Sequence, residues 1–129
     1  MRGGELGAAE RFAIEDAIRT AEQVSRYEFS VFIGRAEGDP HAFATRLHGS
    51  LVAPERSVLI LVDPTARALE IVTGAIVRSH LTDPEVELTA LQMQTSFTEG
   101  DLVGGLRRGI QMLADHARGP DILHSEHRG

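Results

Sequence analysis

The sequence predicts a single α/β domain, an α/β/α sandwich in which a small mixed β-sheet carries helices on both faces. The expected order of elements is α-β-α-β-β-α-α. Segments with apolar residues at helical spacing alternate with short runs rich in β-branched and aromatic residues. A helix separates the first two strands and indicates a right-handed parallel crossover, whereas a short turn separates the last two and indicates an antiparallel hairpin. We expect residues 1–118 to form the domain and residues 119–129 a loose tail.

The first half of the chain is predicted to form a helix, a strand and a second helix. Residues 9–26 place apolar side chains at helical spacing, at Ile14, Ala17, Ile18, Ala21 and Val24. The run "YEFSVFIG" follows and predicts a strand that ends at Gly34. Asp39 followed by Pro40 is a typical helix start, an N-cap before the favoured first position. This helix carries one apolar stripe, formed by Phe43, Leu47 and Leu51.

The next two elements are predicted to be strands. "SVLILVD", residues 57–63, is a continuous apolar run and indicates a central strand that is buried on both faces. "DPTARA" is a turn sequence with proline in a suitable position, and "LEIVTG" after it predicts the third strand. The turn is short, so these two strands should form the hairpin.

Two helices are predicted to complete the domain. Thr82, Asp83 and Pro84 repeat the cap-proline signal. The side chains of the helix that follows are expected to point inward at Val86, Ala90, Met93 and Phe97. Gly100 ends this helix and Asp101 caps the last one, whose inward side chains are Leu102, Leu106, Ile110, Leu113 and Ala117.

Glycines in the last helix need an explanation, because each interior glycine costs about 1 kcal/mol relative to alanine. Gly105 and Gly109 lie one turn apart on the face that continues to Leu113. We expect the flat stripe that they form to seat against the sheet or a neighbouring helix, with Gly105 against another backbone.

Composition excludes several classes of function. A net charge of −6 argues against nucleic acid, and the pair Arg107 and Arg108 is most simply a solvated helix face. The chain contains no cysteine, and all 13 of its cationic residues are arginine, so thiol and lysine chemistry is absent. The sequence has neither the apolar run of a signal peptide nor a stretch that could span a membrane, so we expect a cytoplasmic protein.

One candidate binding site is the crevice at the carboxyl ends of the parallel strands, where open α/β sheets usually bind ligands. Arg35, Asp39 and Asp63 are expected to line it, with Arg35 available to hold an anion. Asp63 also suits the first position of a hairpin turn. It follows a buried strand as in haloacid dehalogenase phosphatases, but Thr65 stands where that chemistry needs a second acid.

A second candidate is a metal site formed by Asp83, Glu99 and Asp101. Ca²⁺ or another divalent cation needs several carboxylate and carbonyl oxygens together. The competing interpretation is that the aspartates cap helices, which would leave fewer lone pairs for a metal. Among the histidines, His41 and His48 are expected on an exposed polar face, and His124 and His127 in the tail.

The order of several short motifs resembles the TPM domain family. The matching positions follow a strand that ends in glycine and continue into the last helix: Gly74, Leu81, Thr82, Asp83, Phe97, Gly100, Asp101 and Gly105. The resemblance implies an α/β/α sandwich. It also implies a choice of functions, because the family includes photosystem II repair factors and modulators of membrane receptors, and acid phosphatase activity and calcium binding have been attributed to some members.

Two functions follow as hypotheses. The first is a binding or accessory module that has an unidentified protein partner and no catalysis of its own. The alternative is a metal-assisted acid phosphatase that acts on phosphomonoesters, in which the three acids hold a cation and an arginine neutralises the phosphate.

Overall fold

The computed structural model describes residues 6–118, so the predicted tail lies outside the described residues. Its helices and strands are α1 (Ala8–Ser25), β1 (Glu28–Ile33), α2 (Pro40–Gly49), β2 (Ser57–Asp63), β3 (Ala68–Thr73), α3 (Asp83–Thr98) and α4 (Leu102–Ala117). Two short 3-10 turns, η1 (Pro54–Arg56) and η2 (Val77–Ser79), flank the ends of the hairpin strands. The order of helices and strands is the one that the sequence predicts.

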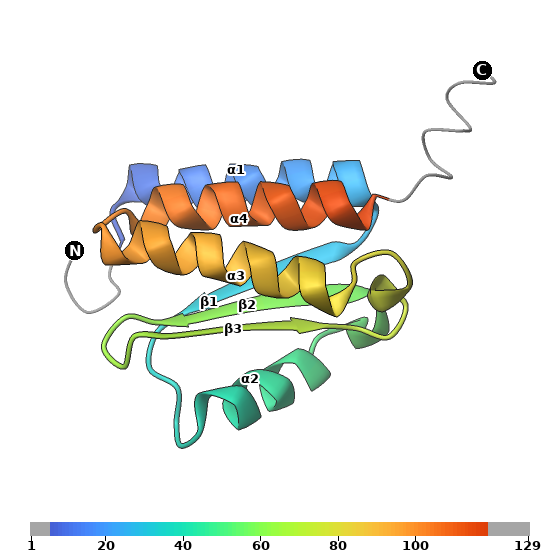
Figure 1. The fold of residues 1–129 in the computed structure, drawn as a ribbon, viewed down its shortest axis with the longest axis horizontal. Coiled ribbons are helices and arrows are strands. Elements are labelled where there is room, and N and C mark those ends of the chain that lie inside the picture. The colour runs from blue at the N-terminus through green and yellow to red at the C-terminus, as the bar shows by residue number, and fades with distance from the viewer. Residues whose placement is uncertain (1–5, 119–129) are drawn as a thin grey trace.

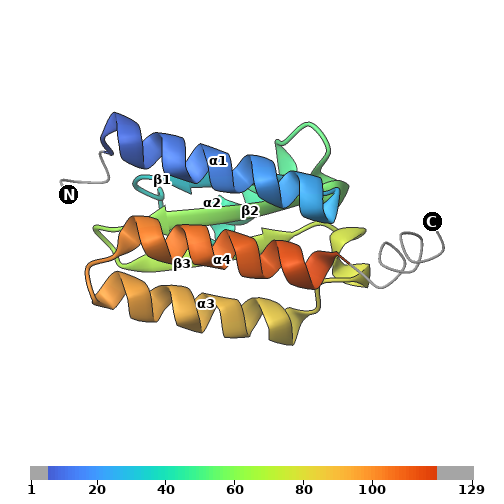
Figure 2. The same ribbon diagram turned by 90° about the horizontal axis from the view of Figure 1, so that it is seen from above.

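The elements form three layers (Figure 1). Helices α1, α3 and α4 cover one face of the sheet and α2 covers the other. Seen from above, α4 lies between α1 and α3 (Figure 2), and it contacts both of them. The predicted α/β/α sandwich is therefore confirmed, with three helices in the outer layer that contains α4.

The sheet has the strand order β1-β2-β3 and is mixed, as predicted. Strands β1 and β2 are parallel with Val31 opposite Ile60, and β2 and β3 are antiparallel with Ile60 opposite Ile71. All residues of β2 are buried, because helices cover both faces and a strand lies on either side. This is the environment that a continuous run of Val, Leu and Ile indicates.

The alternation of side chains along β2 divides the core into two clusters. Val58, Ile60 and Val62 point into the larger cluster, which α1, α3 and α4 cover. Leu59 and Leu61 point to the opposite face and pack against Ala44 and its neighbours on α2. The two-residue period of a strand thus places one half of β2 in each layer.

The glycines of α4 serve packing, as expected, but their neighbours are side chains and not a backbone. A Cβ atom on Gly105 would lie 2.8 Å from the Ser96 Cβ and 2.8 Å from a ring carbon of Phe97. On Gly109 it would lie 2.6 Å from the Met93 Cγ. The expected backbone approach was wrong because α3 turns these larger side chains toward α4.

The helix caps agree with the sequence in two of three cases. Asp39 accepts a hydrogen bond from the Ala42 N–H at 2.9 Å, and Asp101 caps α4. The N-cap of α3, however, is Thr82 and not Asp83, which is the first helical residue. Thr82 and Glu85 form a reciprocal capping box, and this pairing of a hydroxyl with a carboxylate three residues later displaces Asp83 from the cap.

Candidate functional site

The predicted crevice residues lie near the carboxyl ends of β1 and β2. Asp63 is only 4% exposed. Its carboxylate accepts hydrogen bonds from the Ala36 N–H at 3.0 Å and from the Ala66 N–H at 3.1 Å. These backbone donors, Ala36 first, lower the pKa of Asp63, and the positive charge of Arg35 acts in the same direction. Asp63 therefore ties the loop after β1 to the hairpin turn.

The three acids of the predicted metal site do not come together. Asp83 begins α3 and Glu99 follows its last residue. A helix of 16 residues is about 24 Å long, so Asp83 is far from Glu99 and Asp101. Within residues 6–118, no three His, Asp or Glu side chains are grouped so that they could hold a metal ion.

Asp101 is already engaged by protein donors. Its carboxylate accepts from the Gly104 N–H at 2.9 Å and from the Arg108 guanidinium at 3.2 Å. These contacts, the backbone donor first, lower the pKa of Asp101. The capping interpretation of this residue is confirmed.

The histidines are more engaged than the sequence suggested. His48 was expected on an exposed face, but it is only 8% exposed. Its Nε2 lies 3.0 Å from the Ser57 carbonyl oxygen, to which it must donate a hydrogen bond. The prediction was wrong because His48 is on the side of α2 that faces β2. His41 is exposed and pairs with Glu70. His124 and His127 lie outside the described residues.

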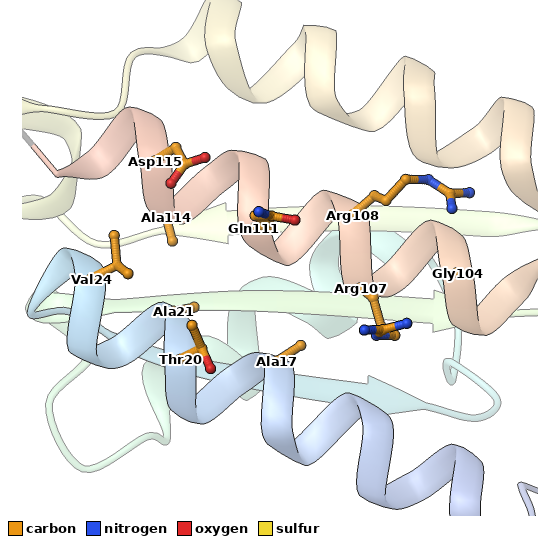
Figure 3. Close-up of a pocket in the computed structure, with 10 residues that line it drawn as sticks. All are labelled: Ala17, Thr20, Ala21, Val24, Gly104, Arg107, Arg108, Gln111, Ala114 and Asp115. Atoms are coloured by element: carbon orange, nitrogen blue, oxygen red, sulfur yellow. The ribbon is translucent and has the colours of Figure 1, made fainter.

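A groove on the outer surface between α1 and α4 has a volume of about 310 Å³ (Figure 3). Helix α1 contributes Ala17, Thr20, Ala21 and Val24. Helix α4 contributes Gly104, Arg107, Arg108, Gln111, Ala114 and Asp115. Ala21 and Ala114 are each 2% exposed and form its floor. Small side chains on both facing helices leave the space that larger ones would fill.

The two neighbouring arginines of the groove have different surroundings. Arg108 points toward α3, where it donates to the Ser96 hydroxyl at 2.9 Å and to Asp101. Arg107 points from α4 toward α1 (Figure 3). No hydrogen bond or ion pair joins its side chain to another residue in the part of the chain that the structure describes, 6–118. Its guanidinium is therefore the cation that the groove can offer to a ligand.

The sequence predicts Arg107 only as part of a solvated face and does not predict the groove. The sequence feature that relates to the groove is the presence of small residues on the groove side of each helix, Ala17 and Ala21 on α1 and Gly104 and Ala114 on α4. This pattern gains meaning only once α1 and α4 are known to be neighbours. Within the described residues, no helix has both the length and the apolar character to cross a membrane.

Comparisons with known proteins place the fold among domains that have been seen before. The chain is similar to the BA42 protein of Bizionia argentinensis, with 25% identity, a TM-score of 0.79 and coverage of 92% of this chain and 84% of that one. It is also similar to the N-terminal domain of a protein from P. gingivalis, with 19% identity, a TM-score of 0.75 and coverage of 88% and 77%. The second likeness shows the fold alone.

Sequence comparisons add two relatives and a family model. The chain is 28% identical over 106 residues to two uncharacterized proteins of Mycobacterium tuberculosis, MT2543 and Rv2468c. The match covers 82% of this chain and 64% of the length of those relatives. A model of the domain of unknown function DUF5130 matches residues 5–114, so the chain belongs to the DUF5130 family.

Proposed function

We propose that this DUF5130 domain is a binding module without catalysis of its own, and that it holds a segment of a protein partner in the α1–α4 groove. The observation that carries the proposal is a concave surface with an apolar floor beside the guanidinium of Arg107. Within residues 6–118 this guanidinium has no hydrogen-bond or ion-pair partner. Binding sites commonly combine apolar walls with a few such polar groups. The resemblance to TPM domains, some of which are repair factors or receptor modulators, supports an accessory role.

The chemistry of the acids favours binding over catalysis. Asp63 and Asp101 each accept two hydrogen bonds from protein donors, which leaves less capacity to hold a metal ion or to transfer a proton. Asp39 caps α2 in the same manner. The chain also lacks cysteine and lysine nucleophiles.

A peptide selection tests the groove directly. Random short peptides would be selected on the wild-type protein, and their affinity would be measured for two variants of α1. Thr20→Trp places a large ring on the exposed rim of the groove, whereas Arg19→Trp, the matched control, places the same ring on the adjacent residue outside it. We expect selected peptides to bind the wild type and the control equally and to lose at least about tenfold in affinity with Thr20→Trp. Peptides that bind Thr20→Trp as well as they bind the wild type, or the absence of any binder, would overturn the proposal.

The phosphatase alternative has its own test. Calorimetric titration with Ca²⁺, Mg²⁺ and Mn²⁺ should give no binding heat, because Asp83 is remote from Glu99 and Asp101 and the Asp101 carboxylate is occupied. A generic phosphomonoester should not be hydrolysed. If hydrolysis occurred with a divalent cation and was abolished by Asp101→Asn, the phosphatase would replace the binding module as the function.

A further inference from the structure

We infer that the α1–α4 groove selects an extended peptide segment of the pattern acid-x-apolar-x-base. This inference rests on the proposed binding function and names the chemistry of the partner. Arg107, Gln111 and Asp115 recur at intervals of four residues along α4, and all three line the groove. A cation, an amide and an anion therefore follow one another along one stripe of the helix.

The spacing of these groups sets the spacing in the ligand. Arg107 and Asp115 are eight residues apart, which corresponds to about 12 Å along the helix axis. An extended peptide rises about 3.3 Å per residue, so the same distance separates side chains about four residues apart. Alternate side chains of an extended segment point to one face, so positions 1, 3 and 5 of a five-residue segment can all face the groove. Acid, apolar and basic side chains at these positions would meet Arg107, the alanine floor and Asp115.

The middle of the groove favours an extended backbone over a helix. Gln111 and Thr20 offer amide and hydroxyl groups on either side of the floor formed by Ala21 and Ala114. An extended segment has unpaired backbone N–H and C=O groups that can use these partners, whereas a helix satisfies its own. A volume of about 310 Å³ is also small for a helix, whose diameter with side chains is about 10–12 Å.

The helix dipoles reinforce the polarity of the side chains. Helices α1 and α4 run in the same direction, with their N-termini at the same end of the molecule (Figure 1). Arg107 is in the first half of α4, whereas Asp115 is in its last turn. Val24 and Asp115 are in the last turns of their helices, so the negative ends of both dipoles lie at the Asp115 end of the groove. At the other end only the positive end of α4 is near, at Gly104, because α1 begins nine residues before Ala17. An occupant with one charge of each sign complements this arrangement.

Four capped peptides test the inference: acetyl-Glu-Thr-Leu-Thr-Lys-amide and its counterparts with two Glu, two Lys or two Gln at the ends. Binding would be followed by chemical-shift changes of the backbone amides. We expect the wild type to prefer the Glu/Lys peptide over both like-charged peptides by about tenfold, the value of one charge-assisted contact. Arg107→Glu should shift the preference to the Lys/Lys peptide, and Asp115→Arg should shift it to the Glu/Glu peptide. Arg19→Glu, a charge reversal outside the groove, should leave the preference unchanged.

The outcomes separate this inference from the proposed function. If the selected peptides bind in the groove but the charge variants do not change the preference among the four probes, the polarity inference is wrong and the binding module stands. If the two-Glu peptide binds the wild type best, Asp115 does not contact the occupant and the inference is again wrong. Failure of the peptide selection itself would remove both.

Discussion

Replacement of Gly105 by leucine tests how α3 and α4 pack. Already the Cβ atom would lie 2.8 Å from atoms of Ser96 and Phe97, which is closer than real Cβ contacts. The void beside Gly105 measures about 30 Å³, little more than the space of a water molecule, so three further carbon atoms do not fit. Overpacking of this kind lowers the free energy of unfolding by about 1–3 kcal/mol. The higher helix propensity of leucine raises it by less than about 1 kcal/mol.

We expect a net loss of about 1–2 kcal/mol for Gly105→Leu, which lowers the Tm of a domain of this size by roughly 4–8 °C. Thermal unfolding followed by circular dichroism measures this. The matched control is Gly49→Leu in α2, where an added Cβ meets nothing within 4 Å. The control should keep the wild-type Tm or raise it slightly. An unchanged or raised Tm for Gly105→Leu would refute the packing argument and leave the glycine to a functional explanation.

Three further predictions concern stability. Gly74→Ala should cost about 3 kcal/mol or more, measured by urea unfolding, because its Cβ would meet the backbone of η1, which cannot move aside as a side chain can. Asp63→Asn should cost about 1–3 kcal/mol, since an amide presents one acceptor oxygen to two backbone donors. The pKa of Asp63 is lower in the folded state than in the unfolded state. Its contribution to the free energy of unfolding is therefore complete above the unfolded pKa and is lost as the pH falls through the folded pKa. The difference in stability between the wild type and Asp63→Asn should accordingly shrink in acid, below about pH 4. His48→Leu should cost about 0.5–1.5 kcal/mol in the same unfolding assay, because the buried Ser57 carbonyl loses the imidazole donor and keeps only the Gly74 N–H. An unchanged midpoint would contradict this role.

Local interactions explain what the sequence determined by itself. The apolar spacing of α1, the uninterrupted run in β2 and the cap at Asp101 each depend on residues within a few positions of one another. The same locality explains the error at Asp83, where two adjacent residues both suited the cap and the reciprocal bonds of Thr82 decided between them. The crossover and the hairpin also followed, because loop length and handedness restrict how three strands can connect.

Tertiary structure decided the position of every candidate site. The length of α3 separates Asp83 from Asp101, and the orientation of α2 against β2 buries His48. The groove requires that Ala21 and Ala114, far apart in the chain, face each other across two neighbouring helices. A small side chain in a helix has the same local signature whether it faces solvent, a core or a groove. Which of these it faces is set by the packing of whole elements, and that depends on contacts between residues distant in the sequence.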